Sequence, residues 1–167
     1  INYHRHALHI LGNYSDQGNH LLFEAQRMVY AGAFFPEFKE ATGWRESGIS
    51  ILNREIKKQV YPDGGQYELD PHYHLAAINI FCKALRMADV NGFRQEFPVE
   101  YVNTLKNMIE FYSNICFPDY SNPCFSDAKL GDRPAEVRNY QDWLKLFPDC
   151  DWIRYYATEG REGSPLP

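Results

Sequence analysis

Apolar residues recur every three or four positions along most of the chain, and no window keeps the strict alternation of a half-buried strand. Because an α-helix completes a turn in about 3.6 residues, this spacing places each set of apolar residues on one helix face. Three clear sets are Ile49, Leu52, Ile56 and Val60; His74, Ala77, Phe81, Leu85 and Ala88; and Tyr101, Leu105, Met108, Tyr112 and Ile115. The pattern predicts an all-α fold.

Segments rich in glycine and proline separate these apolar stripes. They lie at residues 12–18, 32–36, 62–65 and 91–92, and a long irregular stretch follows at 117–134. Helices are therefore expected at residues 1–11, 19–32, 44–60, 71–89, 98–115 and 134–146. Pro71, Pro98 and Pro134 suit the first helical turn, where the missing N–H costs little. Connections of intermediate length favour antiparallel helix pairs within a single domain.

Composition excludes several classes of protein. The 167 residues are enough for one domain with a sizeable core, and 16% of them are aromatic, which suits both core packing and the walls of sugar-binding grooves. The net charge is −5 and basic residues do not cluster, so a nucleic-acid partner is not expected. No run of about 18 apolar residues exists, so neither is a membrane span. The chain opens on Ile1 without a signal peptide, which suggests a piece of a longer protein.

Cysteine and histidine spacings do not indicate a metal site. The four cysteines form no CxxC motif and have no histidine at zinc-finger spacing. Cys116 and Cys124 could pair in an oxidising compartment, whereas Cys82 lies on an apolar helix face and is more simply a buried thiol. His72 and His74 are two residues apart, so on a helix they point to different sides. We expect no metal and no other cofactor in this chain.

Two short polar stretches carry the candidate chemistry. Residues 18–25 and 65–74 gather amide, imidazole, phenol and carboxylate groups at the starts of two predicted helices. This combination suits proton transfer on an acidic sugar, because the carboxylate of a uronic acid must be neutralised before the adjacent C5 proton can leave. Asn19, His20 and Tyr73 are the candidate catalytic residues.

Each of these candidates also has a structural explanation. Asn19 precedes an apolar run and could simply be an N-cap, or its amide could donate to a substrate carboxylate near the positive end of the helix dipole. Tyr73 lies at the edge of an apolar stripe, where it could be a core residue, a base or an acid. Spacing alone does not choose between these roles.

Two other functions remain open at this point. Glu24, Glu68 and Asp70 invite the interpretation of an inverting glycoside hydrolase, in which two carboxylates act across the glycosidic bond. A noncatalytic helical module could instead hold acidic glycan through aromatic and basic residues. Candidate anion-binding side chains for either function are Arg27, Arg54, Lys57 and Lys58.

At these residues the chain resembles the heparinase II/III family of polysaccharide lyases, most closely its heparan-sulfate lyases. The similar segments are Gly18-Asn19-His20-Leu21-Leu22-Phe23-Glu24-Ala25-Gln26-Arg27, Ile51-Leu52-Asn53-Arg54-Glu55-Ile56, and the run from Gln59 to His74 that contains Tyr61-Pro62-Asp63-Gly64-Gly65 and Pro71-His72-Tyr73-His74. The stretch Tyr155-Tyr156-Ala157-Thr158-Glu159-Gly160 also resembles the family, at the point where its helical toroid gives way to a β-sandwich.

The resemblance implies a fold and a mechanism. The fold would be part of an incomplete (α/α) toroid of antiparallel helix pairs. Asn19 would neutralise the uronate carboxylate, Tyr73 would protonate the leaving glycosidic oxygen, and His20 would share carboxylate binding or base work. Further substrate contacts are expected from Gln66, Glu68, His74 and Arg27. The product would be a 4,5-unsaturated uronate formed by β-elimination, with heparan sulfate as the expected substrate.

The resemblance also implies that part of the active site lies elsewhere. The family uses a base histidine from its β-sandwich domain, which has no counterpart in this sequence, and the metal of the group lies outside the helical part. Residues 1–167 are therefore expected to form one helical domain, a central and late slice of the toroid. The missing β-sandwich would be its partner, and activity of this chain alone would be weak or absent. A bacterial periplasmic or secreted location is implied by the family only.

Overall fold

The computed structural model describes residues 2–167, and this range contains helices but no strand. The elements are α1 (Asn2–Gly12), α2 (Gly18–Phe34), α3 (Ala41–Gln59), α4 (Pro71–Asn91), the 3-10 helix η1 (Arg94–Glu96), α5 (Val99–Ile115), α6 (Arg133–Leu144) and α7 (Asp151–Ala157). The predicted all-α class is confirmed. Within the same range no helix is both long and apolar enough to cross a bilayer.

The predicted helices all exist, with shifted ends. The helix expected at 44–60 begins at Ala41 and ends at Gln59, and the one expected at 134–146 runs from Arg133 to Leu144. The first residue of the helix expected at 1–11 lies outside the described residues. Two short elements, η1 and α7, were not predicted, because three and seven residues are too few to show a helical repeat.

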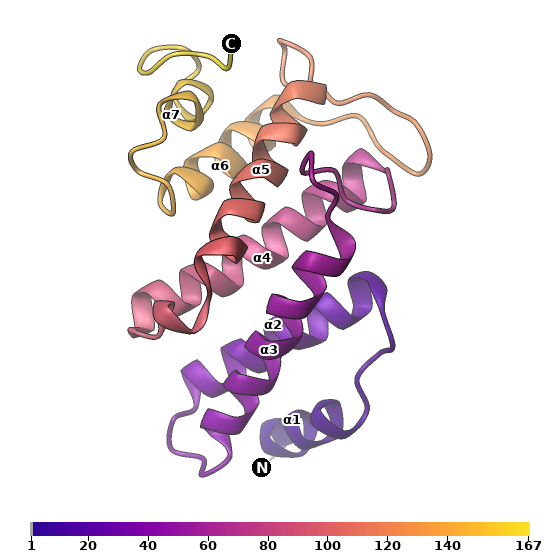
Figure 1. Cartoon of the computed structure of the whole chain (residues 1–167), viewed down its shortest axis with the longest axis vertical. Coiled ribbons are helices and arrows are strands. Elements are labelled where there is room, and N and C mark those ends of the chain that lie inside the picture. The colour runs from indigo at the N-terminus through magenta and orange to yellow at the C-terminus, as the bar shows by residue number, and fades with distance from the viewer. Residues whose placement is uncertain (1) are drawn as a thin grey trace.

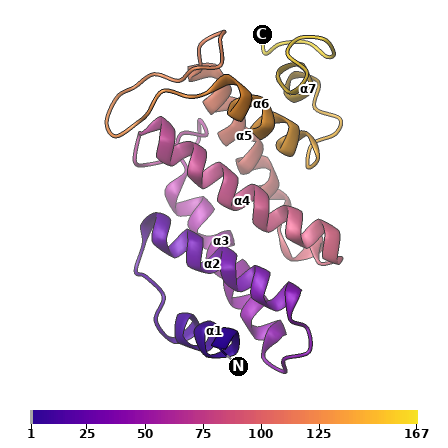
Figure 2. The same ribbon diagram turned by 180° about the vertical axis from the view of Figure 1, so that it is seen from behind.

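The helices form two layers (Figures 1 and 2). Helices α2, α4 and α6 lie in one layer, and α3 and α5 lie in the other. Consecutive helices pair as antiparallel hairpins, α2 with α3 and α4 with α5, while α7 packs against α6. This arrangement of paired helices matches the expected segment of an (α/α) toroid.

Close contact between α2 and α3 depends on two glycines. A Cβ atom on Gly48 would lie 2.4 Å from the carbonyl oxygen of Ala25, and one on Gly32 would lie 2.3 Å from that of Ala41. Both distances are far below van der Waals contact, so a side chain at either position would force the helices apart. The two glycines therefore set how closely α3 supports α2.

Helix α4 crosses the centre of the molecule and has clear signals at both ends. The carboxylate of Asp70 caps its first turn by accepting from the backbone N–H groups of His72 (2.7 Å) and Tyr73 (3.0 Å). Gly92 ends it in the left-handed conformation, with φ of +77°. Its buried face packs on α5, where the Tyr101 hydroxyl donates to the carbonyl oxygen of Phe81 at 3.1 Å.

The cysteines are free thiols, so the disulfide left open for Cys116 and Cys124 is not present. Cys82 is buried in the core, as expected from its apolar helix face. Burial also raises the pKa of the Cys116 thiol to about 12, so this side chain stays protonated at neutral pH.

Candidate functional site

A buried hydrogen bond aligns α2 with α4. The Gln26 amide donates to the carbonyl oxygen of Ile80 at 3.0 Å, across a separation of 54 residues. At the start of α2, Asn19 contacts Glu68, which lies just before α4, so the two helices run in the same direction. The separation of 54 residues also relates Asn19 to Tyr73. Since parallel helices rise equally per residue, these two residues lie at the same end of the pair.

Asn19 is not the N-cap of α2. Gln17 holds that position without a side-chain cap, and Asn19 is the second residue of the helix. Its Nδ2 atom donates to Oε1 of Glu68 at 3.1 Å, while its Oδ1 atom is buried without a hydrogen-bond partner among the described residues. The N-cap interpretation of Asn19 is therefore wrong, and its amide is directed at a carboxylate.

Gln66 supplies a second amide to the same carboxylate oxygen. Its side chain is buried, and its Oε1 atom accepts from the backbone N–H of Glu68 at 3.0 Å. This bond turns Nε2 toward Oε1 of Glu68, to which it donates at 3.2 Å. Two amides from distant parts of the chain thus converge on one oxygen.

The turn before α4 fixes Gln66 and Glu68 in place. An isolated antiparallel bridge pairs Val60 with Gln66, and the N–H of Tyr67 donates to the carbonyl oxygen of Gln59 at 2.8 Å. Leu69 closes the turn with φ of +54°, a strained value for a residue with a side chain. Strain of this kind persists only where the surrounding contacts enforce it.

The His74 side chain does not point into the site; it holds the backbone of the turn that carries Gln66. The ring is buried; its Nδ1 atom accepts from the backbone N–H of Gln66 at 3.1 Å, and Nε2 donates to the carbonyl oxygen of Met108 at 2.9 Å. Burial lowers the pKa of His74 to about 4, so the ring is neutral at pH 7. Because both nitrogens are engaged within the chain, the substrate contact expected of His74 is replaced here by a supporting role.

Tyr73 reaches the long loop between α5 and α6. It is only partly buried, and its hydroxyl donates to Oδ2 of Asp127 at 3.4 Å. The Asp127 carboxylate is the main cause of a raised pKa for Tyr73, with smaller contributions from desolvation and from the carboxylates of Asp70 and Glu68. A raised pKa keeps the phenol protonated, which suits a proton donor and not a base. The core interpretation of Tyr73 is wrong.

Two of the three carboxylates considered for hydrolysis are occupied by structural contacts. Glu24 accepts from the backbone N–H (2.7 Å) and the hydroxyl (2.9 Å) of Ser15. Asp70 caps α4 and also accepts from the backbone N–H of Asp127 at 2.9 Å. Of these three, Glu68 alone is directed at the Asn19 and Gln66 amides, so Glu24, Glu68 and Asp70 do not form the pair of carboxylates that an inverting hydrolase needs.

His20 and Arg27 lie on the exposed side of α2. His20 directly follows Asn19 at the same end of the helix. Arg27 lies two turns further on and lines a groove of about 470 Å³ between α2 and α4. The other residues lining this groove are Phe23, Gln26, Tyr30, Ala76, Asn79, Ile80 and Lys83. The groove therefore starts near the Asn19 end and combines aromatic side chains with two cations.

Sequence reasoning missed Asp127 and Lys83. Asp127 lies in the irregular loop that was expected to carry binding residues, but no local motif distinguishes it from the loop's other acidic residues. Lys83 shares one face of α4 with Ala76 and Asn79, at helical spacing, and could have been found by asking which residues flank the apolar stripe.

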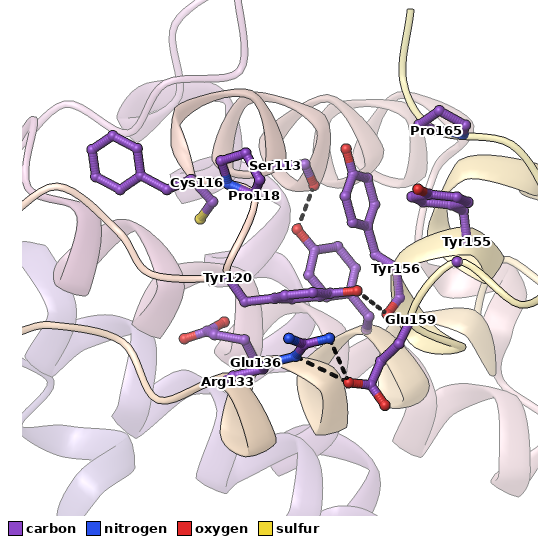
Figure 3. Close-up of a pocket in the computed structure, with 13 residues that line it drawn as sticks. Ser113, Cys116, Pro118, Tyr120, Arg133, Glu136, Tyr155, Tyr156, Glu159 and Pro165 are labelled. Carbon is purple, nitrogen blue, oxygen red and sulfur yellow. Dashed lines mark hydrogen bonds and ion pairs between the residues drawn. The ribbon is translucent and has the colours of Figure 1, made fainter.

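A separate pocket lies between the end of α5, α6 and α7 (Figure 3). Its volume is about 320 Å³, and its lining includes Tyr120, Tyr140, Tyr155 and Tyr156. The polar groups there pair with one another, for example the Tyr140 hydroxyl with Ser113 Oγ at 2.9 Å. None of the predicted site residues lines this pocket.

The chain is similar to known proteins over nearly its whole length. The family model described as heparinase II/III N-terminus matches residues 1–155. A heparin-sulfate lyase from Bacteroides stercoris is 68% identical over 164 residues, and one from Pedobacter heparinus is 48% identical over 161. These matches cover 98% and 96% of this chain but only 25% and 24% of the relatives. The chain thus spans about a quarter of their length.

Solved structures show the same similarity in three dimensions. A heparinase III structure superimposes with a TM-score of 0.92 at 70% identity, and a mutant heparan sulfate lyase from Pedobacter heparinus with a TM-score of 0.91 at 47% identity. Both alignments cover nearly the whole of this chain, 99% and 98%, and 26% of each solved chain. The helical arrangement is therefore shared with one part of these larger proteins.

Proposed function

Since the chain belongs to the heparinase II/III family, we propose that it is part of a polysaccharide lyase that cleaves uronate-containing glycosaminoglycan by β-elimination. Heparan sulfate is the favoured substrate, because the relatives are named as heparin-sulfate and heparan sulfate lyases. The observation that carries the proposal is that the Asn19 amide and the Tyr73 phenol lie at the same end of the α2–α4 pair.

In this mechanism Asn19 acts on the substrate carboxylate. Its partly buried amide donates a hydrogen bond to the uronate and so offsets the negative charge that otherwise holds the C5 proton. As that proton leaves, charge moves toward the carboxylate, and a donor aimed there stabilises the developing anion more than the ground state. His20 follows Asn19 and is exposed to solvent, which supports a further contact with the substrate from this side chain.

Tyr73 acts on the leaving group. Removal of the C5 proton supplies the electron pair that forms the C4=C5 double bond, and the C4–O bond breaks. The departing oxygen takes the phenolic proton of Tyr73, which the raised pKa keeps in place until this step. The products are a new sugar hydroxyl and a 4,5-unsaturated uronate, with no water consumed.

The base that accepts the C5 proton is proposed to be a histidine from another domain of the same protein. The family resemblance implies such a histidine in a β-sandwich, and this chain spans only a quarter of its relatives. His74 then serves the site indirectly, because its buried ring accepts from the backbone N–H of Gln66 and holds that backbone in place. Binding of the acidic chain would extend along the groove that contains Arg27.

The test is the product formed from heparan sulfate by the complete protein. Ultraviolet absorbance follows the C4=C5 double bond, and only elimination creates it. Tyr73→Phe should reduce kcat by about 10²–10⁴-fold, and Asn19→Ala should reduce it by about 10²–10³-fold. Tyr61→Phe is the matched control, because Tyr61 is an exposed phenol with no hydrogen bond from its hydroxyl.

Four results would contradict the proposal or one of its parts. Cleavage that yields saturated ends would favour the hydrolase alternative, and full activity of Tyr73→Phe would remove this phenol from the mechanism. Rapid turnover by residues 1–167 alone would show that no base from another domain is needed. Binding of heparan sulfate without any cleavage by the complete protein would favour the noncatalytic module.

A further inference from the structure

We infer that Glu68 is an internal occupant of the substrate-carboxylate site: its side chain fills the amide pair of Asn19 and Gln66, and a uronate must displace it in order to bind. This inference rests on the proposed function, since it concerns the same site. It changes the role of Glu68 from a direct substrate contact to a competitor of the substrate.

The first support is the geometry of the amide pair. Nδ2 of Asn19 and Nε2 of Gln66 lie 3.1 and 3.2 Å from the same oxygen of Glu68. Two neutral donors converging on one anionic oxygen make a carboxylate site, because hydrogen bonds to an ionised acceptor are the stronger kind. The Gln66 amide is buried and its own oxygen is held by the backbone of Glu68, so its direction is fixed.

The second support is that the N-terminus of α2, the positive end of its helix dipole, has no local acidic residue or side-chain cap. This helix has no acidic residue in its first turn, and Gln17 at the N-cap makes no side-chain bond to it. The carboxylate of Glu68 accepts from the side chain of Asn19, the second residue of α2. It is therefore the anionic group that the helix dipole favours at this end. A chain segment 49 residues away thus supplies what a local acidic residue usually supplies.

The third support is that Glu68 is held by a turn and not by burial. Its side chain is only partly buried, and the next residue, Leu69, is exposed and strained at φ of +54°. A strained, exposed position beside Glu68 can relax when the side chain swings away, whereas Gln66 behind it is fixed by the core. In the proposed displacement the Glu68 side chain therefore moves, while the buried Gln66 amide stays in place.

Displacement has a consequence for specificity. A sugar without a carboxylate cannot replace the charge-assisted hydrogen bonds that Glu68 makes, so a neutral glycan would leave the amide pair occupied. A uronate replaces them with equivalent bonds of its own. Glu68 therefore weakens the binding of every substrate, but it excludes neutral sugars more than acidic ones.

The experiment compares Glu68→Gln and Glu68→Ala with the wild type in the complete protein. Glu68→Gln keeps an oxygen that can accept from Asn19 but removes the charge, and Glu68→Ala removes the occupant. We expect both variants to lower KM for heparan sulfate, and the dissociation constant of glucuronate measured by calorimetry, by about three- to tenfold. Discrimination between glucuronate and glucose should decrease in the same variants. Glu46→Gln, an exposed carboxylate on α3, is the control for the loss of one negative charge.

The opposite result would identify a positioning role. If Glu68 only orients the Asn19 amide, Glu68→Ala should raise KM and weaken glucuronate binding, and Glu68→Gln should restore both. That pattern, or unchanged binding in both variants, would overturn the inference. Calorimetry with glucuronate does not depend on cleavage, so it tests the inference separately. The proposed function is tested by whether the complete protein forms the unsaturated product.

Discussion

The backbone N–H of Asp127 donates to the carboxylate of Asp70 at 2.9 Å, which joins the long α5–α6 loop to the residue that caps α4. The carboxylate of Asp127 in turn accepts from the Tyr73 hydroxyl, three residues beyond Asp70. The two aspartates and Tyr73 therefore form one connected unit at the N-terminal end of α4. Through it the loop controls both the position and the protonation of the phenol.

Asp127→Asn should shift the pH dependence of cleavage. The Asp127 carboxylate is the main cause of the raised pKa of Tyr73, so its neutralisation should lower that pKa. A proton donor is active only while it is protonated, so the alkaline limb of the kcat profile should move to lower pH. Asp16→Asn, an exposed residue outside this loop, should leave the limb in place. An alkaline limb that does not move in Asp127→Asn would contradict the acid role of Tyr73.

Removal of the two cations in the α2–α4 groove should weaken binding of sulfated substrate. Arg27→Gln combined with Lys83→Gln should raise KM for heparan sulfate by about tenfold at low salt, and the difference should shrink as added salt screens the charges. An unsulfated uronate polymer should be affected less. Lys57→Gln combined with Lys58→Gln removes the same charge from α3, in the other layer. Equal increases of KM in the two double variants would show a general effect of charge and would contradict substrate binding along the groove.

Gly48→Ala should destabilise the fold. The added methyl group would lie 2.4 Å from the carbonyl oxygen of Ala25, so α2 and α3 would have to separate, at a cost of about 1–3 kcal/mol of unfolding free energy. Gly43→Ala on the same helix meets nothing within 4 Å and should stabilise α3 by up to about 1 kcal/mol. Urea denaturation measures both changes, and a Gly48→Ala variant as stable as Gly43→Ala would disprove the close contact.

Acid should destabilise the protein through His74. Its pKa is about 4 in the fold, against an ordinary value of 6.5, so between these pH values the unfolded chain binds the extra proton. Stability from this residue is therefore complete above pH 6.5 and falls, by about 3 kcal/mol, as the pH drops toward 4. Below pH 4 a protonated Nδ1 would face the N–H of Gln66. The unfolding free energy of His74→Asn, measured by denaturation, should depend less on pH over this range than that of the wild type. His72→Asn, at an exposed position, is the control.

Local patterns predicted most of the helices because each one carries a full apolar stripe. The stripe beginning at Ile49 continues for three turns, and Pro71 and Pro134 mark starts within one residue of the observed ones. Helix α7 lacks this signal, since its seven residues contain only Ile153 and Ala157 as buried positions. It is stabilised by packing on α6, which sequence spacing does not report.

The candidate site was predictable in its members but not in its contacts. Asn19 and Tyr73 were named from two separate polar stretches, and only the fold shows that these stretches meet. The bond from Asn19 to Glu68 spans 49 residues, and that from Tyr73 to Asp127 spans 54. Contacts over such separations depend on helix packing, so the competing N-cap and core interpretations could be rejected only in three dimensions.

The hydrogen bond from Gln26 to Ile80 sets a limit on which length changes the protein can tolerate. One residue inserted between Asn19 and Gln26 would turn Asn19 by about 100° around α2 and move it about 1.5 Å along the axis. The buried Gln26 amide would keep its hydrogen bond to Ile80. The whole displacement would therefore appear at the Asn19 amide, which would no longer face Glu68. Insertions and deletions should therefore be absent from residues 20–25, between Asn19 and Gln26, and from residues 74–79, between Tyr73 and Ile80, although the loops on either side remain free to vary.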